Sequence, residues 1–327
     1  MTTRREVLFG GAAMATTVVA GCATCGGGAF EMTTIAPHSM CGGAGLCVIL
    51  RTPRGKTYLF DTANGDPHGK KTENNGREII APWLRAHGVP EIDGLIVSHY
   101  HGDHFGGFLW LWDHFPIRRV YNNGFVPDTT GLSAYDLQEY RAAREVLDAW
   151  ERAHPGQLVE NLREGDDLGW NEPDVTFDVV WPPRDGYVAP LEDRKGYSKR
   201  DNPFHHLLNA NSNALQVRAF GKTFFIMGDI QADYIRAYMR EHLQKKCQWG
   251  CDYAVLPSHG TKPVETLAEL RQMSPQPTTL VASLGDLPWM ISCGQQDLAV
   301  FGKAGYDIRV TNVHGNVTHV ADFKRPM

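Results

Sequence analysis

The chain has 327 residues, of which 42% are hydrophobic and 21% are charged, and its formal net charge is −5 at pH 7. These values are typical of a folded globular protein, and they exclude a collagen-like, disordered or low-complexity chain. The negative charge also argues against extended binding of nucleic acid, because phosphate contacts require an excess of Lys and Arg.

The first 29 residues are interpreted as an export signal and a tether. Arg4 and Arg5 precede an apolar stretch, residues 10–20, that is too short to span a bilayer and is typical of a twin-arginine signal. Residues 19–22 (VAGC) resemble the lipobox of bacterial lipoproteins, in which Cys22 would be lipidated; ordinary signal cleavage nearby is the alternative. We therefore expect an exported protein of the periplasm or cell envelope, attached to the membrane through Cys22.

The elements that follow are predicted from hydrophobic periodicity and turn residues. Residues 46–51 and 57–60 are expected to form a hairpin, a helix is expected over 77–87, and an apolar strand over 94–97. Apolar residues at steps of three and four predict a long helix over 133–154. Further strands are predicted at 175–181, 214–220, 223–227, 253–256, 279–283, 307–311 and 317–321, with helices at 231–244 and 295–301.

Two β-rich blocks with intervening helices indicate an α/β fold of four layers, in which two sheets pack together and helices cover the outside. Composition shows no break that would mark a linker, so residues 30–327 are interpreted as one domain. His314 is expected at the tip of a hairpin that joins the last two strands.

The most informative segment is His99-Tyr100-His101-Gly102-Asp103-His104, which directly follows the predicted strand 94–97. Three histidines and an aspartate within six residues are typical of a metal site, and alternate residues on such a loop can face the same way. His99 and His101 could then bind one ion, while Asp103 and His104 face a second. Imidazole and carboxylate ligands suit Zn, Mn or Fe.

Three more candidate residues, Asp61, Asp229 and His259, also lie where a predicted strand ends. Strand ends at one edge of a sheet converge in space, so residues that are distant in sequence can form one site. We therefore expect these residues to lie beside the histidine-rich segment.

The histidine-rich segment resembles the His-x-His-x-Asp-His signature of metallo-β-lactamase-fold hydrolases, which implies a four-layer αββα sandwich. Within that resemblance, Asp61 looks like the early structural aspartate, Asp229 like the metal-bridging aspartate and His259 like the last histidine ligand. The segments 179–183, 211–215 and 224–229 are similar to blocks of the hydrolase domain of ComEC-type DNA-uptake proteins and their stand-alone exported relatives.

The resemblance implies hydrolysis by a hydroxide that two divalent metal ions activate, with Zn expected first and Mn as the alternative. One ion would be bound by His99, His101 and Asp229, and the other by Asp103, His104, Asp229 and His259, with Asp103 also orienting the hydroxide as the catalytic residue. The substrate would be a small-molecule or polymer ester, with a phosphoester or phosphodiester favoured. A lactone, thioester or β-lactam is the alternative, and a non-catalytic exported metal-binding lipoprotein is an alternative from another class.

The sequence departs from the family pattern before Asp229. Many members of the fold supply a further histidine there, whereas this chain has Asn211 and Asn213, with His205 and His206 a few residues earlier. Which of these four completes the first metal site is left open. Two further questions stay open: how the cysteines pair, and whether Tyr100 contacts substrate or packs in the core.

Overall fold

The computed structural model describes residues 28–37, 45–65, 74–127, 134–191, 203–260, 262–285 and 298–322. The proposed signal and lipidation site, residues 1–27, lie outside the described residues. Within the described part of the chain, no helix has both the length and the apolar character needed to cross a membrane.

The first of two sheets has seven strands in the order β13-β1-β2-β3-β4-β5-β6. Strands β3 to β6 are parallel, so their carboxyl ends lie at one edge. The strands are β1 (Phe30–Thr34), β2 (Val48–Arg51), β3 (Thr57–Phe60), β4 (Gly94–Val97), β5 (Val120–Asn122), β6 (Leu158–Val159) and β13 (Val317–Ala321).

The second sheet has six strands in the order β12-β11-β10-β9-β8-β7. Strands β9 to β12 are parallel, whereas β7 and β8 pair in antiparallel fashion. The strands are β7 (Val175–Trp181), β8 (Ala214–Ala219), β9 (Lys222–Ile226), β10 (Tyr253–Val255), β11 (Thr279–Ala282) and β12 (Asp307–Val310).

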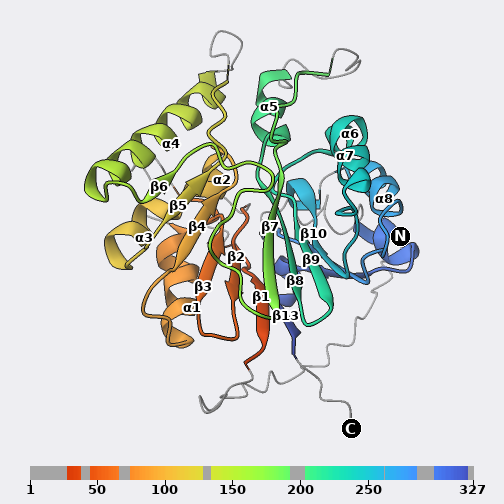
Figure 1. Cartoon of the computed structure of the whole chain (residues 1–327), viewed down its shortest axis with the longest axis horizontal. Coiled ribbons are helices and arrows are strands. Elements are labelled where there is room, and N and C mark those ends of the chain that lie inside the picture. Colours follow the sequence, from red (N-terminus) through yellow and green to blue (C-terminus); the bar gives the residue numbers. More distant parts are fainter. Residues whose placement is uncertain are drawn as a thin grey trace, which may run out of the picture.

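The two sheets pack face to face, and helices cover their outer faces (Figure 1). Helices α1 (Ala81–Ala86), α3 (Phe108–His114) and α4 (Ala134–Ala153) lie against the first sheet, and α6 (Ala232–Tyr234), α7 (Arg240–Lys245) and α8 (Pro263–Leu270) against the second. This arrangement confirms the expected four-layer αββα sandwich. Other helical segments are η2 (Gly76–Ile80), α2 (Gly102–Phe105), α5 (Pro203–Ala210), η3 (Ile235–Met239), η4 (Pro257–Gly260) and α10 (Thr311–His314), and residues 298–303 are also helical.

Successive side chains along a strand point to opposite faces of the sheet, and this alternation produces the layers. Tyr58 and Phe60 of β3 point into the core between the sheets, whereas Leu59 between them packs with the residues under the helices. Both faces of such a strand are buried, so none of its residues is charged. Tyr58 also stacks on Trp170, with 4.0 Å between ring centroids.

Most predicted elements are present, with changed boundaries. The helix expected over 77–87 is divided into η2 and α1, with Pro82 in the first turn of α1, where its missing N–H does no harm. The expectation for His314 was wrong: it ends the helical turn α10, and β12 and β13 belong to different sheets rather than to one hairpin.

Candidate metal centre

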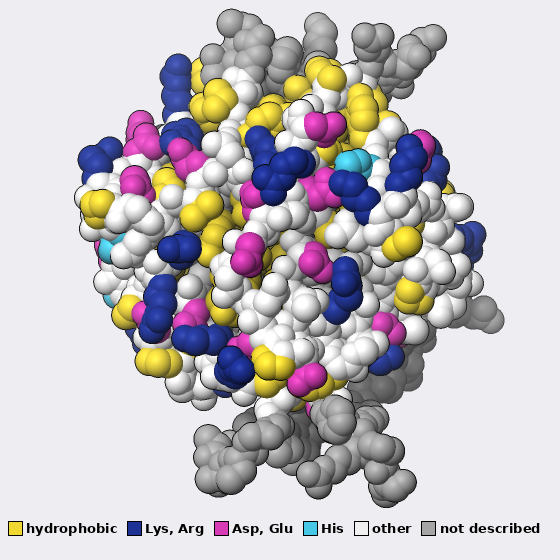
Figure 2. All heavy atoms as spheres, in the orientation of Figure 1, with side chains coloured by type: hydrophobic (Ala, Val, Ile, Leu, Met, Phe, Trp, Pro, Cys, Tyr) yellow, Lys and Arg dark blue, Asp and Glu magenta, His cyan; other side chains and the backbone are white. Residues whose placement is uncertain are grey.

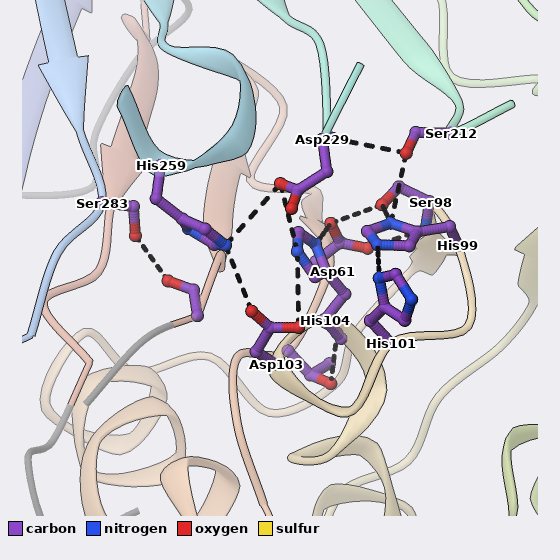
Figure 3. Close-up of polar contacts among 12 residues, drawn as sticks. Asp61, Ser98, His99, His101, Asp103, His104, Ser212, Asp229, His259 and Ser283 are labelled. Atoms are coloured by element: carbon purple, nitrogen blue, oxygen red, sulfur yellow. Dashed lines mark hydrogen bonds and ion pairs between the residues drawn. The ribbon is translucent and has the colours of Figure 1, made fainter. Parts of the chain in front are cut away.

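Both sheets contribute to one cluster of polar side chains. Asp61 follows β3, and His99 follows its parallel neighbour β4. On the second sheet Asp229 follows β9, and His259 follows β10, which is parallel to β9. Because the carboxyl ends of parallel strands share an edge, residues up to 198 positions apart along the chain meet at one end of the sandwich (Figure 3).

The histidine-rich segment itself makes a tight turn. It leaves β4 in an extended conformation and forms the short helix α2, which begins after His101. Glu139 of α4 is buried, and its Oε2 accepts a hydrogen bond of 2.5 Å from the Gly102 N–H at the start of that helix. A Cβ at Gly106 would lie 2.1 Å from the Gly65 nitrogen, so this loop needs glycine to approach its neighbour.

The first predicted pair of ligands is in contact. His99 Nε2 and His101 Nδ1 are 2.9 Å apart, and both side chains are buried. Figure 3 shows the two rings on the side of the cluster nearest Ser212. Two nitrogen atoms at this separation are placed to face one common point.

The remaining four predicted ligands form the second part of the cluster. His104 Nε2 lies 3.2 Å from Asp229 Oδ1 and 3.8 Å from Asp103 Oδ1, whereas His259 Nε2 lies 3.2 Å from Asp103 Oδ2 and 3.6 Å from Asp229 Oδ1. Ligand atoms about 2.0–2.1 Å from a tetrahedral zinc ion would be about 3.3 Å apart. The observed separations therefore match a set of donor atoms around one ion.

Orphaned polar atoms support the same interpretation. His104 Nε2, His259 Nε2 and Asp229 Oδ1 are buried and have no hydrogen-bond partner among the described residues, although they are close to one another. Buried polar atoms are rarely left unpaired unless an ion or water satisfies them. The donor set of imidazoles and carboxylates thus fits a divalent metal.

The donor atoms form two groups of three, and within each group the atoms lie within 4.8 Å of one another. His99, His104 and Asp229 form one group, and Asp103, His104 and His259 form the other. His104 belongs to both groups, and His101 joins the first through its contact with His99. The structure therefore brings all six predicted ligands together, while their division between two ions stays a prediction.

Asp61 orients this cluster from behind. Its buried carboxylate accepts hydrogen bonds of 2.7 Å from the Ser98 N–H, the Ser98 hydroxyl and His104 Nδ1. With a metal ion bound, a proton kept on His104 Nδ1 would leave the lone pair of Nε2 facing the ion, which is the arrangement that metal-bound histidines need. Asp61 thus orients the predicted ligand His104 from outside the two groups of donor atoms.

Three residues at the cluster have unusual backbone conformations. Asp61, Ser258 and His259 have φ angles of 60°, 47° and 58°. Such angles are uncommon for residues with a side chain and persist where the surrounding structure enforces them, typically at functional sites.

The carboxylates and the imidazoles of the cluster shift one another's pKa values in opposite directions. Burial alone would lower the pKa of His104, but Asp229, Asp103 and Asp61 outweigh it and raise that pKa well above its usual range. Burial would raise the pKa of Asp103, but His104 and His259 hold it well below its usual range. The pKa of Asp229 is lowered as well, so Asp103 and Asp229 are ionised at neutral pH, and positive charge is favoured at the centre of the cluster.

Among the four residues considered for the missing ligand, His206 is the histidine whose side chain is described, and it joins neither metal-ligating group. Asn211 accepts a hydrogen bond from the Val188 N–H, and Asn213 Nδ2 donates to the Leu162 carbonyl, so both have structural roles. His206 is buried in α5, and the side chain of His205 lies outside the described residues.

Ser212, which contacts His99 and lies between the two asparagines, was not predicted as a site residue. A lone serine has no pattern that could have identified it. The open question about Tyr100 is answered: it is buried, and its hydroxyl donates to Asn122 Oδ1 at 3.1 Å, so it packs in the core. Cys247 and Cys251 are free thiols.

Comparisons with known proteins agree with this geometry. The family model of the metallo-beta-lactamase superfamily matches residues 42–239. ComE operon protein 3 of Bacillus subtilis is 26% identical over 211 residues, which cover 64% of this chain and 22% of that protein. An uncharacterised protein of Escherichia coli, YcaI, is 37% identical over 81 residues, which cover 24% of this chain and 10% of that protein. The chain thus matches less than a quarter of the length of either relative.

Solved structures include a metal-dependent hydrolase of the beta-lactamase superfamily, with 15% identity, a TM-score of 0.49, and coverage of 90% of this chain and 99% of the other. A diphosphatase of the PhnP family has 13% identity, a TM-score of 0.43, and coverage of 88% and 97%. The family match spans more than half of the chain and includes the histidine-rich segment and Asp229. The chain therefore belongs to the metallo-beta-lactamase superfamily and is a metallo-hydrolase.

Proposed function

We propose that this protein hydrolyses a phosphoester or phosphodiester with two divalent metal ions, Zn in first place and Mn as the alternative. His99, His101 and Asp229 would hold one ion, and Asp103, His104, Asp229 and His259 the other. The observation that supports this most directly is the set of donor-atom separations of 2.9 to 3.8 Å among these six residues.

Divalent ions at this position would lower the pKa of water and polarise the scissile bond. The chain's own residues have distinct tasks. Asp229 is buried, with 9% of its side chain exposed, and it lies between the two histidine groups. Asp103 has 28% of its side chain exposed, so it is the carboxylate of the cluster that faces solvent. Because it is ionised and faces solvent, Asp103 is placed to orient an attacking water.

The phosphoester proposal rests on similarity to ComE operon protein 3 and on the blocks shared with ComEC-type hydrolase domains. A short ester substrate fits better than a long nucleic acid, because the net charge is −5. Figure 2 shows basic and acidic side chains interspersed on one face, with no continuous basic surface there.

The experiment that tests this proposal compares substrate classes on one preparation. We expect zinc-loaded protein to hydrolyse bis(p-nitrophenyl) phosphate, and the variants His101→Ala and Asp103→Ala to lose that activity while they keep a folded circular-dichroism spectrum. Cleavage of a chromogenic cephalosporin, a lactone or a thioester, with none of the phosphodiester, would overturn the substrate class. Full activity in metal-stripped protein would overturn the metal mechanism.

We also propose that the chain is exported and lipidated at Cys22, which rests on the twin arginines and the sequence VAGC at residues 19–22. Labelled palmitate should be incorporated by the wild-type chain expressed in a bacterium and not by a Cys22→Ala variant. Equal labelling of both would contradict lipidation at this residue.

A further inference from the structure

Ser212 lies behind His99, on the side away from His101. Its Oγ is 3.2 Å from His99 Nδ1, whereas His99 Nε2 faces His101. The same oxygen accepts a hydrogen bond of 3.3 Å from the Asp229 N–H. One buried hydroxyl therefore contacts two of the three residues of the first metal site (Figure 3).

The chain holds Ser212 rigidly in this place. Asn211 Oδ1 accepts from the Val188 N–H at 3.0 Å, and the Asn213 N–H donates to the Ser98 carbonyl at 2.9 Å. All three residues of the Asn-Ser-Asn segment are at most 1% exposed. The asparagines thus fix the backbone on both sides, and Ser212 is left to face the cluster.

The hydrogen bonds around His99 determine where its proton lies. The single hydroxyl proton of Ser98 is donated to Asp61, so the Ser98 oxygen, 3.0 Å from His99 Nδ1, acts there as an acceptor. An acceptor at this distance requires a proton on His99 Nδ1. Nε2 then carries the lone pair, and Ser212 provides a second acceptor for the same N–H.

We propose that Ser212 is a positioning residue of the first metal site: it holds His99 in the tautomer and orientation that present Nε2, and it fixes the backbone of Asp229. This deepens the proposed function and rests on its two-ion site. In place of a further ligand before Asp229, the chain would stabilise the first site by fixing the ligands that it has.

The test compares the Co²⁺ affinities of the wild-type protein and the Ser212→Ala variant. Metal-free protein is titrated with Co²⁺ in competition with a chelator, and binding is monitored by visible absorption. Loss of an outer hydrogen bond to a metal ligand lowers affinity by roughly ten- to a hundredfold. We expect that loss at the site of His99, with a smaller loss at the other site, which shares Asp229 but not His99. Ser212→Thr, which keeps the hydroxyl, should restore the affinity.

The matched control is Ser283→Ala. Ser283 is equally buried, and its hydroxyl donates to the Gly45 carbonyl at 2.6 Å rather than to a ligand, so both affinities should stay at the wild-type value. Equal affinities in Ser212→Ala and wild type, or equal losses at both sites, would overturn the role of Ser212. A wild-type protein that binds fewer than two ions would overturn the two-ion proposal and this inference with it.

A second measurement does not depend on a variant that folds. Long-range ¹H–¹⁵N spectra of the wild-type protein report which nitrogen of His99 carries the proton. We expect Nδ1–H, and the Nε2–H tautomer would overturn the inference whatever the variants do.

Discussion

Replacing Asp61 with Asn should disturb the metal centre without disturbing the backbone. The φ angle of Asp61 is 60°, a conformation that Asn adopts more readily than other residues with a side chain. The amide oxygen can still accept from the Ser98 N–H. The amide nitrogen, however, would face His104 Nδ1, where a donor would meet a donor.

His104 can relieve this clash by moving its proton from Nδ1 to Nε2. That nitrogen faces Asp229 at 3.2 Å and is the atom expected to bind metal, so the substitution should lower metal affinity by roughly ten- to a hundredfold. A hydrogen bond to a charged group contributes about 1.5–3 kcal/mol, and the carboxylate accepts three of them. Burial of the charge opposes this gain, because it raises the pKa of Asp61. We therefore expect a net loss of about 2–4 kcal/mol in the free energy of unfolding.

The assay is urea unfolding of metal-free protein together with a zinc titration. Asp93→Asn is the matched control: Asp93 accepts from the Thr57 N–H at 2.9 Å and from Lys56 Nζ at 2.8 Å, but it contacts none of the proposed ligands. It should keep wild-type zinc affinity and lose about 1 kcal/mol or less of stability. If Asp61→Asn matched this control in both measurements, the orienting role of Asp61 would be refuted.

Three further results are expected. Burial lowers the pKa of His319 from 6.5 to about 4, so the unfolded chain binds a proton at this residue more readily than the folded protein does. The free energy of unfolding should therefore fall by up to about 3 kcal/mol as the pH drops from about 6.5 toward about 4. Urea titrations at acid pH should show less of this loss in His319→Phe. Tyr100→Phe should lower the free energy of unfolding by about 1 kcal/mol and leave turnover unchanged, since the lost bond is internal; a fall in kcat would contradict this. A chelator should lower Tm, because metal binds only the folded site, and an unchanged Tm in differential scanning calorimetry would count against tight binding.

The sequence predicted the layers well because the strands carry a strong periodic signal. Residues 57–60 and 94–97 are buried at every position and carry no charged side chain, as expected for strands buried on both faces, and both form parallel strands. It missed β1 (Phe30–Thr34), whose pairing with β2 and β13 depends on residues as far away as Ala321. Propensity over five residues cannot report such a contact.

Helices that tertiary packing determines were also harder to predict. The run Phe108–His114 is rich in aromatic residues, which favour strands, yet it forms α3 because Phe108 and Leu111 are buried on one face. The helix α8 begins at Pro263, after the left-handed residue Lys262, and it was not predicted.

The clustering of the six proposed ligands could be predicted because imidazole and carboxylate groups at strand ends are a chemical signal that one sequence contains. The residues that orient them are different. Ser212 and Glu139 are of common types, and only the folded chain brings Ser212 to His99 and Glu139 to Gly102, each across more than 30 positions. Their roles follow from contacts and could not be derived from spacing.

We propose that two divalent ions lie at the junction of the two sheets. Anomalous diffraction at the zinc edge, measured on crystals of the zinc-loaded protein, tests this proposal most directly. We expect two peaks, one bounded by His99, His101 and Asp229 and the other by Asp103, His104, Asp229 and His259. A single peak, or zinc bound away from these residues, would contradict the account.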